Sequence, residues 1–293
     1  MRVTESLKYA TVTSQLGQLR EQYMQASQQS SSGKRVNAPS DDPIAAAENA
    51  RVQASLSQTD AYRKAISAVQ GDAQMAESSL DSAGQVLQRA LELATSGANG
   101  ASGEANLKSL GIEANQLVDQ MISIGNTKGS QGYLFGGTRT NVAPFDAGGT
   151  FVGNDKSQQV TLDGGPPMTV TVSGANAFAN VNGRNVIQDL KDLASALSSG
   201  DSNAVRATLD GLQSSHSQVV QERANAGLIS DRLTMTDSFL TQTQFDLTAR
   251  SSSLTDADAT ATLSSLSQLG TTIQQAVAVD QKLLQLSTVT LSG

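Results

Sequence analysis

The sequence predicts a mainly α-helical protein of long helices packed side by side, interrupted by a small β-rich segment. Three observations predict this fold. Aromatic residues make up only 3% of the 293 residues and tryptophan is absent, so the side chains that usually fill one broad core are scarce. Apolar residues recur every three or four positions near both ends of the chain, as in a coiled-coil seam. Glycine, proline and short alternating stretches replace that period between residues 132 and 183.

Residues 2–32 are predicted to form the first helix, and Gly33 is a natural left-handed terminator for it. A loop at residues 33–43 follows, with two prolines and turn-forming polar residues. Asp41 or Asp42 is predicted to cap the next helix, or to form a salt bridge with Arg35 of the same or a neighbouring chain. The predicted seam of the first helix consists of Tyr9, Val12, Leu16, Leu19, Tyr23 and Ala26.

The second helix is predicted from about residue 44 to residue 96, a stretch that contains no proline. At 1.5 Å per residue it would be about 75 Å long, so its apolar stripe needs partners along its whole length. After a glycine-rich break at residues 97–103, a third helix is expected to fold back antiparallel to it. The stripe of the second helix consists of Tyr62, Ile66, Val69, Ala73, Ala76, Leu80, Ala83, Leu87, Ala90 and Ala94, and that of the third of Leu107, Leu110, Ala114, Leu117, Met121 and Ile124.

The segment 132–183 is predicted to be a small β-rich insertion. Two short alternating runs, residues 160–162 and 168–172, flank the turn sequence DGGPP at residues 163–167. That arrangement is typical of a β-hairpin.

Helices are predicted to resume at about residue 185 and to continue to the carboxy-terminal region. A short helix carries Val186, Leu190, Leu193 and Leu197 and ends at Gly200. A long helix follows, with a stripe of Val205, Leu209, Leu212, Val219, Ala226, Leu233, Leu240 and Leu247. In the last segment, about 255–290, one seam consists of Leu266, Leu269, Ile273, Ala276 and Leu283. Beside it, at multiples of seven residues, lie Leu263, Val277, Leu284 and Leu291, so the apolar stripe is wide. Because chain ends usually fray, apolar stripes at both ends predict that each end needs a partner, the simplest being the other end.

The composition argues against several functions. A net charge of −7 provides no basic surface for a nucleic-acid backbone, and no apolar run approaches the roughly 20 residues that span a membrane. The first residues lack the apolar stretch and cleavage site of a secretory signal peptide. Because cysteine is absent, the chain forms no disulfide and has no thiolate ligand or nucleophile.

The residues that could carry chemistry favour structural roles. His216, the single histidine, lies in a heptad position of the long helix, which favours a packed helical side chain over a catalytic base. Asp256 and Asp258 lack the glycine and glutamate that complete a calcium loop, which favours capping of the last helix. The sequence GGT at residues 136–138 is not followed by the lysine of a phosphate loop and is interpreted as a turn. We therefore predict no enzymatic activity, no cofactor and no metal.

Both ends of the chain resemble the bacterial flagellin superfamily. Residues 32–43 (SGKRVNAPSDDP) resemble its signature of a small residue, Gly, Arg, a hydrophobic residue, Asn and Asp-Asp. Residues 249–258 (ARSSSLTDAD) resemble its carboxy-terminal signature, and residues 223–227 (RANAG) with Arg232-Leu233 resemble the pattern before it. Within the superfamily, the form of the loop, the short insertion and residues 133–138 (YLFGGT) resemble the branch that joins the flagellar hook to the filament.

The resemblance implies three layers. Residues 1–43 with 252–293 would form a terminal coiled-coil domain that lines an inner tube. Residues 44–135 with 185–251 would form a helical bundle outside it, and residues 136–184 the projecting insertion. The terminal helices are expected to be poorly ordered in the monomer, because a single pair buries too little surface to offset the entropy of ordering.

The resemblance also implies partners and a location. Copies of the chain would assemble head to tail into a ring or helical layer, between hook-associated protein 1 and the flagellin filament. The chain would be exported by the flagellar type III apparatus without a cleaved signal peptide, escorted by a chaperone that binds its carboxy-terminal region, and would reside in the extracellular flagellum. The candidate assembly residues are Val12, Leu16, Leu19, Tyr23, Arg35, Asp41, Asp42, Leu263, Leu266, Ile273, Val277 and Leu284.

Other functions remain open at the level of the sequence. Filament flagellin belongs to the same superfamily, although the ending LSTVTLSG at residues 286–293 departs from the Leu-rich ending common in flagellins. A secreted coiled-coil adhesin or effector would require a host ligand that no feature indicates. An enzyme housed in the insertion is disfavoured, because that segment has neither His nor Cys.

Overall fold

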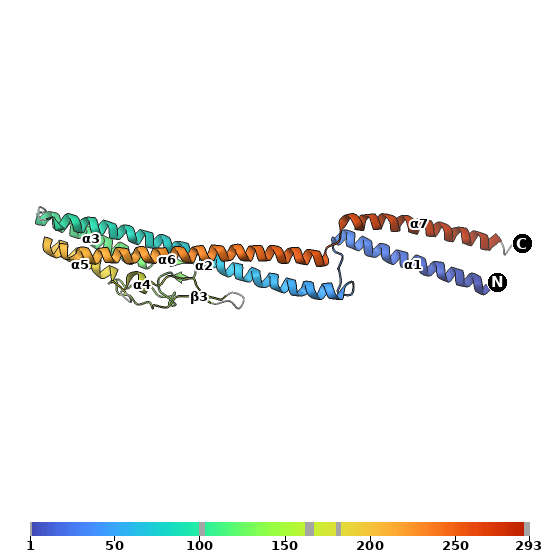
Figure 1. Ribbon diagram of the computed structural model, residues 1–293, viewed down its shortest axis with the longest axis horizontal. Helices are drawn as coiled ribbons and strands as arrows, with labels where there is room; N and C mark the ends of the chain where they lie inside the picture. The colour runs from blue at the N-terminus through green and yellow to red at the C-terminus, as the bar shows by residue number, and fades with distance from the viewer. Residues whose placement is uncertain (1, 100–102, 162–166, 180–182, 290–293) are drawn as a thin grey trace. The chain divides into compact units, whose positions relative to one another are not determined.

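The computed structural model describes residues 2–99, 103–161, 167–179 and 183–289. Long helices dominate it, as predicted (Figure 1). The helices are α1 (Arg2–Ser32), α2 (Pro43–Ala98), α3 (Glu104–Gly125), α4 (Gly174–Phe178), α5 (Val186–Ser199), α6 (Ser202–Thr255) and α7 (Ala259–Val289). The strands are β1 (Lys128–Gly129), β2 (Gly132–Tyr133), β3 (Gln159–Val160) and β4 (Met168–Thr169). The chain divides into two compact units, Met1–Thr59 with Thr243–Gly293, and Asp60–Gln242.

The unit at residues 60–242 holds the hydrophobic core. Nine residues of the predicted α2 stripe are buried and Tyr62 is half-buried, so the helical period of the sequence located the inward face correctly. The stripe of α6 is equally well placed, because Val205, Leu212, Val219 and Leu233 are fully buried. The nine buried α2 residues are Ile66, Val69, Ala73, Ala76, Leu80, Ala83, Leu87, Ala90 and Ala94.

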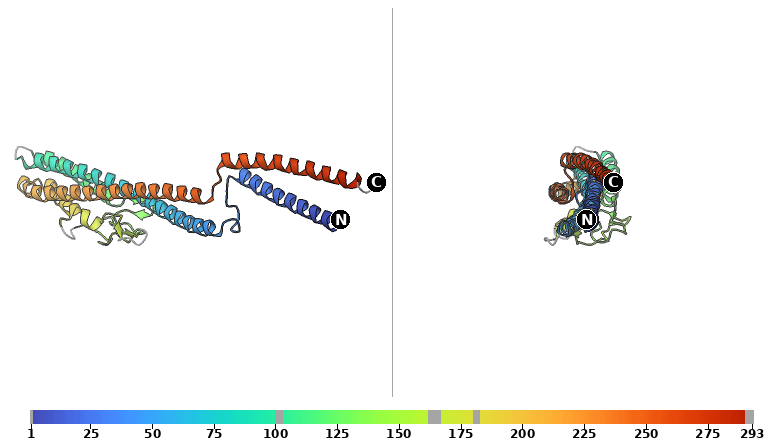
Figure 2. Two further views of the ribbon diagram at one scale, coloured as in Figure 1. Left: turned by 45° about the vertical axis from the view of Figure 1, so that its right-hand side comes forward. Right: turned by 90° about the vertical axis from the view of Figure 1, so that its right-hand side faces the viewer.

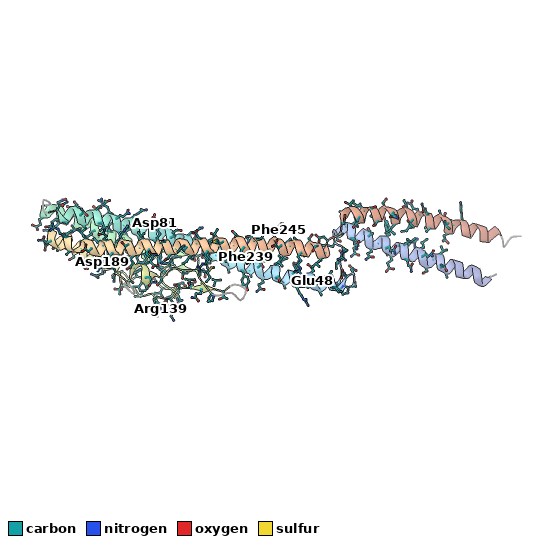
Figure 3. The ribbon with its side chains drawn as sticks, in the orientation of Figure 1. Glu48, Asp81, Arg139, Asp189, Phe239 and Phe245 are labelled. Atoms are coloured by element: carbon teal, nitrogen blue, oxygen red, sulfur yellow. The ribbon has the colours of Figure 1, made fainter. Side chains whose placement is uncertain are left out.

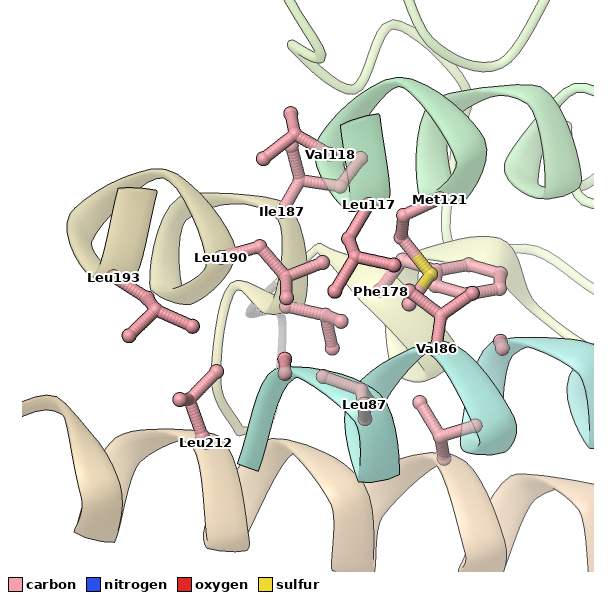
Figure 4. Close-up of a cluster of buried hydrophobic side chains, with 14 of the residues drawn as sticks. Val86, Leu87, Leu117, Val118, Met121, Phe178, Ile187, Leu190, Leu193 and Leu212 are labelled. Atoms are coloured by element: carbon pink, nitrogen blue, oxygen red, sulfur yellow. The ribbon is translucent and has the colours of Figure 1, made fainter. Parts of the chain in front are cut away.

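Helices α3 and α5 complete the bundle. Figure 4 shows side chains of α3 and α5 meeting those of α2 and α6, for example Met121, Leu190, Leu87 and Leu212. The predicted return of α3 along α2 is confirmed, and Arg89 of α2 forms an ion pair with a glutamate of α3. Local signals set both ends of α5. The Asn185 side chain caps its first turn, accepting a hydrogen bond from the Gln188 amide, and Gly200 ends it with a left-handed φ of 73°.

The insertion combines two short hairpins, one short helix and an aromatic cluster. The predicted hairpin is confirmed in its pairing, with Gln159 opposite Thr169 and Val160 opposite Met168, and residues 162–166 of its turn lie outside the described residues. The β1–β2 hairpin and α4 had no prediction. The ring of Phe178 lies between Phe135 and Phe145, with centroid distances of 5.3 and 5.9 Å in edge-on geometry. These rings give the insertion an apolar centre despite its few paired strands.

The unit formed by residues 1–59 and 243–293 contains α1, α7 and the connectors that lead into and out of them (Figure 2). Helix α1 has the predicted bounds, and Gly33 ends it with a left-handed φ of 67°. Three residues separate the end of α6 at Thr255 from the start of α7 at Ala259. The two helices run side by side and contact each other.

Candidate assembly interface

The contact between α1 and α7 is an apolar seam that the pair covers only in part. Ala26 of α1 and Thr262 of α7 are buried, and the ring of Tyr23 lies beside Gly270. The other described seam side chains are half-buried. The half-buried residues are Val12, Leu16 and Leu19 of α1, and Leu266, Leu269, Ile273, Ala276 and Val277 of α7. A two-helix pair therefore leaves much of its own seam accessible.

Some candidate assembly residues lie outside this seam. Leu263 is 58% exposed, which shows that the wide stripe of α7 includes a face that α1 does not cover. The side chains of Leu284 and Tyr9 lie outside the described residues. The stripes did not identify two other exposed apolar side chains, Met24 of α1 and Val279 of α7.

The two connectors of this unit are joined to each other by backbone hydrogen bonds. The Arg35 amide donates to the Thr255 carbonyl at 2.7 Å, and the Ala257 amide donates to the Gly33 carbonyl at 2.9 Å. Lys34 and Asp256 thereby form an isolated antiparallel bridge. We call this contact the clasp, defined by Gly33, Lys34, Arg35, Thr255, Asp256 and Ala257.

Side chains reinforce the clasp. The Lys34 ammonium lies 2.5 Å from a carboxylate oxygen of Asp256 and 3.3 Å from the Thr255 hydroxyl. Hydrogen bonds from Lys34 and from Ser252 lower the pKa of the Asp256 carboxyl below its ordinary value. The Arg35 guanidinium donates to the Leu254 carbonyl at 2.8 Å. The residues of both flagellin-like signatures thus meet at one place.

Arg35, Asp41 and Asp42 have partners within the same chain. The Asp41 carboxylate accepts hydrogen bonds from the backbone amides of Asn37 and Ala38, at 2.9 and 2.8 Å. Asp42 caps α2 by accepting from the Ala45 amide, and its other oxygen pairs with Arg35 at 3.1 Å. The Ala45 amide, followed by Arg35, holds the pKa of Asp42 below its ordinary value. The predicted capping and the predicted ion pair are both confirmed.

The start of α2 and the end of α6 pair through polar side chains. The Gln53 amide donates to the Ser251 hydroxyl, which in turn donates to the Asn49 side-chain oxygen at 2.7 Å. Arg250 and Glu48 form an ion pair beside them. Two large apolar side chains of these segments are exposed instead, Ile44 at 80% and Phe245 at 69%. These two bulky apolar side chains are therefore on the surface.

A second exposed apolar surface lies on α6 within the other unit. Leu228, Met235 and Phe239 are 66%, 72% and 69% exposed and line a shallow groove together with Asp231, Arg232 and Thr236. Figure 3 marks the positions of Phe239 and Phe245 on α6. The predicted stripe of α6 did not include these residues, because they lie on the face opposite its core.

The remaining residues singled out in the sequence have structural surroundings. His216 is half-buried on α6, as the packed-helix interpretation predicts. Asp258 caps α7, accepting hydrogen bonds from the amides of Thr260 and Ala261 at 2.8 and 3.0 Å. Gly137 has a φ of 70° in a turn that the Asn154 side chain bridges to Thr138. Within the described ranges no three His, Cys, Asp or Glu side chains are placed to hold a metal ion, and no described helix has the length and hydropathy of a membrane span.

Two family models match most of the chain. Residues 4–140 match the bacterial flagellin N-terminal helical region, and residues 209–291 match the bacterial flagellin C-terminal helical region. The second match includes α7 and most of α6, and the first includes α2, α3 and all of α1 except its first two residues. Both halves of the clasp lie inside these matches.

Curated relatives agree with this assignment. Flagellar hook-associated protein 3 of Escherichia coli strain K12 is 28% identical over 298 residues, which cover 94% of each chain. Flagellar hook-associated protein 3 of Salmonella typhimurium strain LT2 is 30% identical over 183 residues, which cover 62% of this chain and 58% of that relative.

Solved structures show the same fold. A Bacillus cereus FlgL structure has a TM-score of 0.61 at 23% identity, covering 69% of this chain and 99% of that one. The flagellar junction protein FlgL from Legionella pneumophila has a TM-score of 0.58 at 13% identity, covering 71% of this chain and 100% of that one. At these identities the likeness supports the fold alone.

Proposed function

The chain belongs to the bacterial flagellin superfamily, in the branch of hook-associated protein 3, and we propose that it is the structural subunit that joins the flagellar hook to the flagellin filament. The relative from Escherichia coli that supports this branch spans nearly the whole chain. The chain acts by assembly, and its location is the flagellum outside the cell.

The observation that carries the proposal is the partly covered seam of α1 and α7. Each helix is 31 residues long, yet most described seam residues remain half-exposed in the single chain. Apolar surface that stays accessible along a helix pair is typical of protein interaction sites. Neighbouring copies cover it, and the terminal helices of the monomer become fully ordered only in that assembly.

The assembly is a ring or helical layer with head-to-tail contacts, because a heterologous interface is required for a subunit that continues a tube. Its inner layer is residues 1–43 with 252–293, its middle layer residues 44–135 with 185–251, and its outer projection residues 136–184. The outward apolar residues of α6 support contacts between neighbouring bundles in the middle layer.

The partners on either side of the layer are hook-associated protein 1 and flagellin. The chain reaches them through the flagellar type III apparatus, and a chaperone binds the carboxy-terminal region during export. The exposed apolar residues of α7, including Leu263 and Val279, would be the surface that such a chaperone protects.

Electron microscopy of a strain lacking the gene tests this function. The expected result is hooks without filaments, with flagellin released into the medium and motility restored by the wild-type gene in trans. Filaments of normal number and length in the deletion strain would contradict the proposal. A strain deleted for flagellin is the matched control, because it also lacks filaments but releases no flagellin.

A further inference from the structure

The two terminal helices leave the rest of the chain through separate connectors, and the clasp is where those connectors meet. The residues that pair in the clasp are about 220 positions apart in the sequence, and the ion pair of Lys34 with Asp256 is an example. Without a contact of this kind, only the partly covered seam would hold α1 against α7. We infer that the clasp, and the Lys34–Asp256 pair in particular, sets the register of α1 against α7 and is the end from which the terminal coil forms.

Burial along the coil supports a start at the clasp. The two side chains that are buried in the described parts of α1 and α7, Ala26 and Thr262, lie seven and five residues from the clasp, whereas the seam residues Leu16 and Ile273 farther along are half-buried. Leu263, although close to the clasp, lies on the face that α1 does not cover and is exposed. A helix pair with so narrow a covered seam is marginal alone, because nucleation is unfavourable. A contact that holds one end together raises the effective concentration of the two helices and favours pairing there first.

The seam by itself leaves the register under-determined. Leu263, Gly270 and Val277 follow one another at intervals of seven residues on α7, and Tyr23 of α1 lies beside the middle one. A slip of one heptad, about 10.5 Å at 1.5 Å per residue, would place Tyr23 beside Leu263 or Val277 of the same column, so the heptad spacing alone permits more than one pairing. The clasp prevents that slip, because it pairs one residue of each connector through both backbone and side chains.

Lys34 and Asp256 are therefore positioning residues for assembly, and this consequence rests on the proposed function. Neighbouring copies can cover the seam regularly only when every copy presents its two helices in the same register. The inference about the register itself concerns the isolated chain, so it is measured without a flagellum.

Cross-linking of the purified full-length protein tests the register. The chain has no cysteine, so pairs of introduced cysteines can be joined selectively by a short bis-maleimide. The protein with Tyr23→Cys and Gly270→Cys reports the native register. The protein with Tyr23→Cys and Val277→Cys reports the slipped register. Each of these two proteins also receives Lys34→Asp, Asp256→Lys or both. Replacing Tyr23 removes the ring whose contact with Gly270 would itself favour the native register. The ratio of native to slipped cross-link then depends mainly on the clasp.

The single charge changes are expected to lower the ratio of native to slipped cross-link about threefold, as for an ion pair of this exposure. The double exchange is expected to recover most of that ratio. Equal ratios in all variants, or a double exchange no better than the singles, would overturn the inference. The control exchanges the charges of Lys108 and Glu104, a comparably exposed pair on α3, and should leave the ratio unchanged.

Hydrogen exchange on the same proteins distinguishes loss of register from loss of folding. Amides next to the clasp are expected to exchange more slowly than those toward the chain ends, and the single variants should lose that gradient. Amides of α3 and α5 should retain their protection throughout. A gradient that persists in both single variants would contradict the role of the clasp, even if the deletion strain behaves as proposed.

Discussion

The hydroxyl of Ser215 in α6 donates a hydrogen bond to the carboxylate of Asp189 in α5, with 2.5 Å between the two oxygens. Both residues are buried. Arg184 forms an ion pair with the same carboxylate, and the Gln218 side chain accepts a hydrogen bond from the Arg184 amide at 2.7 Å. A single buried carboxylate thus fixes the place where the chain returns from the insertion to the bundle.

Replacing this carboxylate should destabilise the bundle. Asp189→Ala leaves the Ser215 hydroxyl buried without an acceptor and removes the partner of Arg184, whose side chain stays half-exposed to water. We expect a loss of roughly 1–3 kcal/mol in the free energy of unfolding, measured by urea denaturation. Asp192 lies about one turn after Asp189 on α5 but is exposed. Asp192→Ala is therefore the control, and it should change the free energy of unfolding by less than about 0.5 kcal/mol. Equal effects of the two substitutions would contradict the proposed role of Asp189.

Two phenylalanines should separate folding from assembly. Phe178 is fully buried against two other rings, so Phe178→Ala should lower the free energy of unfolding by about 3–5 kcal/mol. Phe239 is 69% exposed, so Phe239→Ala should leave the stability of the monomer within about 0.5 kcal/mol of wild type. Phe239→Ala should instead reduce the number of filaments in a complemented deletion strain. Normal filament number with Phe239→Ala would argue against a subunit contact at this face.

The terminal seam should be dispensable for the bundle and essential for assembly. A chain lacking residues 1–40 and 255–293 is expected to retain the cooperative unfolding of the unit at residues 60–242, but to restore no filaments to the deletion strain. The double variant Leu19→Asp with Ile273→Asp should likewise unfold cooperatively and restore no filaments, because both side chains lie in the half-buried seam. Filaments in the strain that carries the truncated chain would contradict the assembly role of the ends.

Acid should loosen the clasp. Lys34 holds the pKa of Asp256 below its ordinary value, and Ser252 and Thr255 add hydrogen bonds to the same carboxylate. A depressed folded pKa contributes stability above the unfolded value of about 3.9, and that contribution is lost as pH falls through the folded pKa. Carboxyl chemical shifts from NMR should therefore give Asp256 a midpoint below the ordinary one. Lys34→Met should move the midpoint upward, and an unchanged midpoint would show that Lys34 has no part in it.

The sequence located the helices and their inward faces because a period of 3.6 residues is visible over dozens of positions. The same logic explains why Ile66, Leu80 and Leu233 were expected to be buried, as they are. In α7 it placed Leu266 on the seam and Leu263 and Val277 beside it, but it did not predict that Leu263 is exposed whereas Val277 is half-buried. Only the position of α1 decides between them, and a single helix contains no information on it.

Contacts between distant residues were the main omission. Nothing local in the sequence pairs Lys34 with Asp256 or Asp189 with Ser215. The five residues of α4 and the two-residue strands β1 and β2 are too short for a periodic signal. A usable hint did exist for the clasp, because Lys34 and Asp256 belong to the two flagellin-like signatures at opposite ends of the chain.

In the proposed function this chain forms a junction layer rather than the filament itself. Immunogold labelling of intact flagella tests it most directly, with an antibody against an epitope tag placed in the outward insertion and untagged wild-type flagella as the background control. The expected result is one band of gold between the hook and the filament. Gold along the whole length of the filament would contradict the account and identify the chain as a filament flagellin.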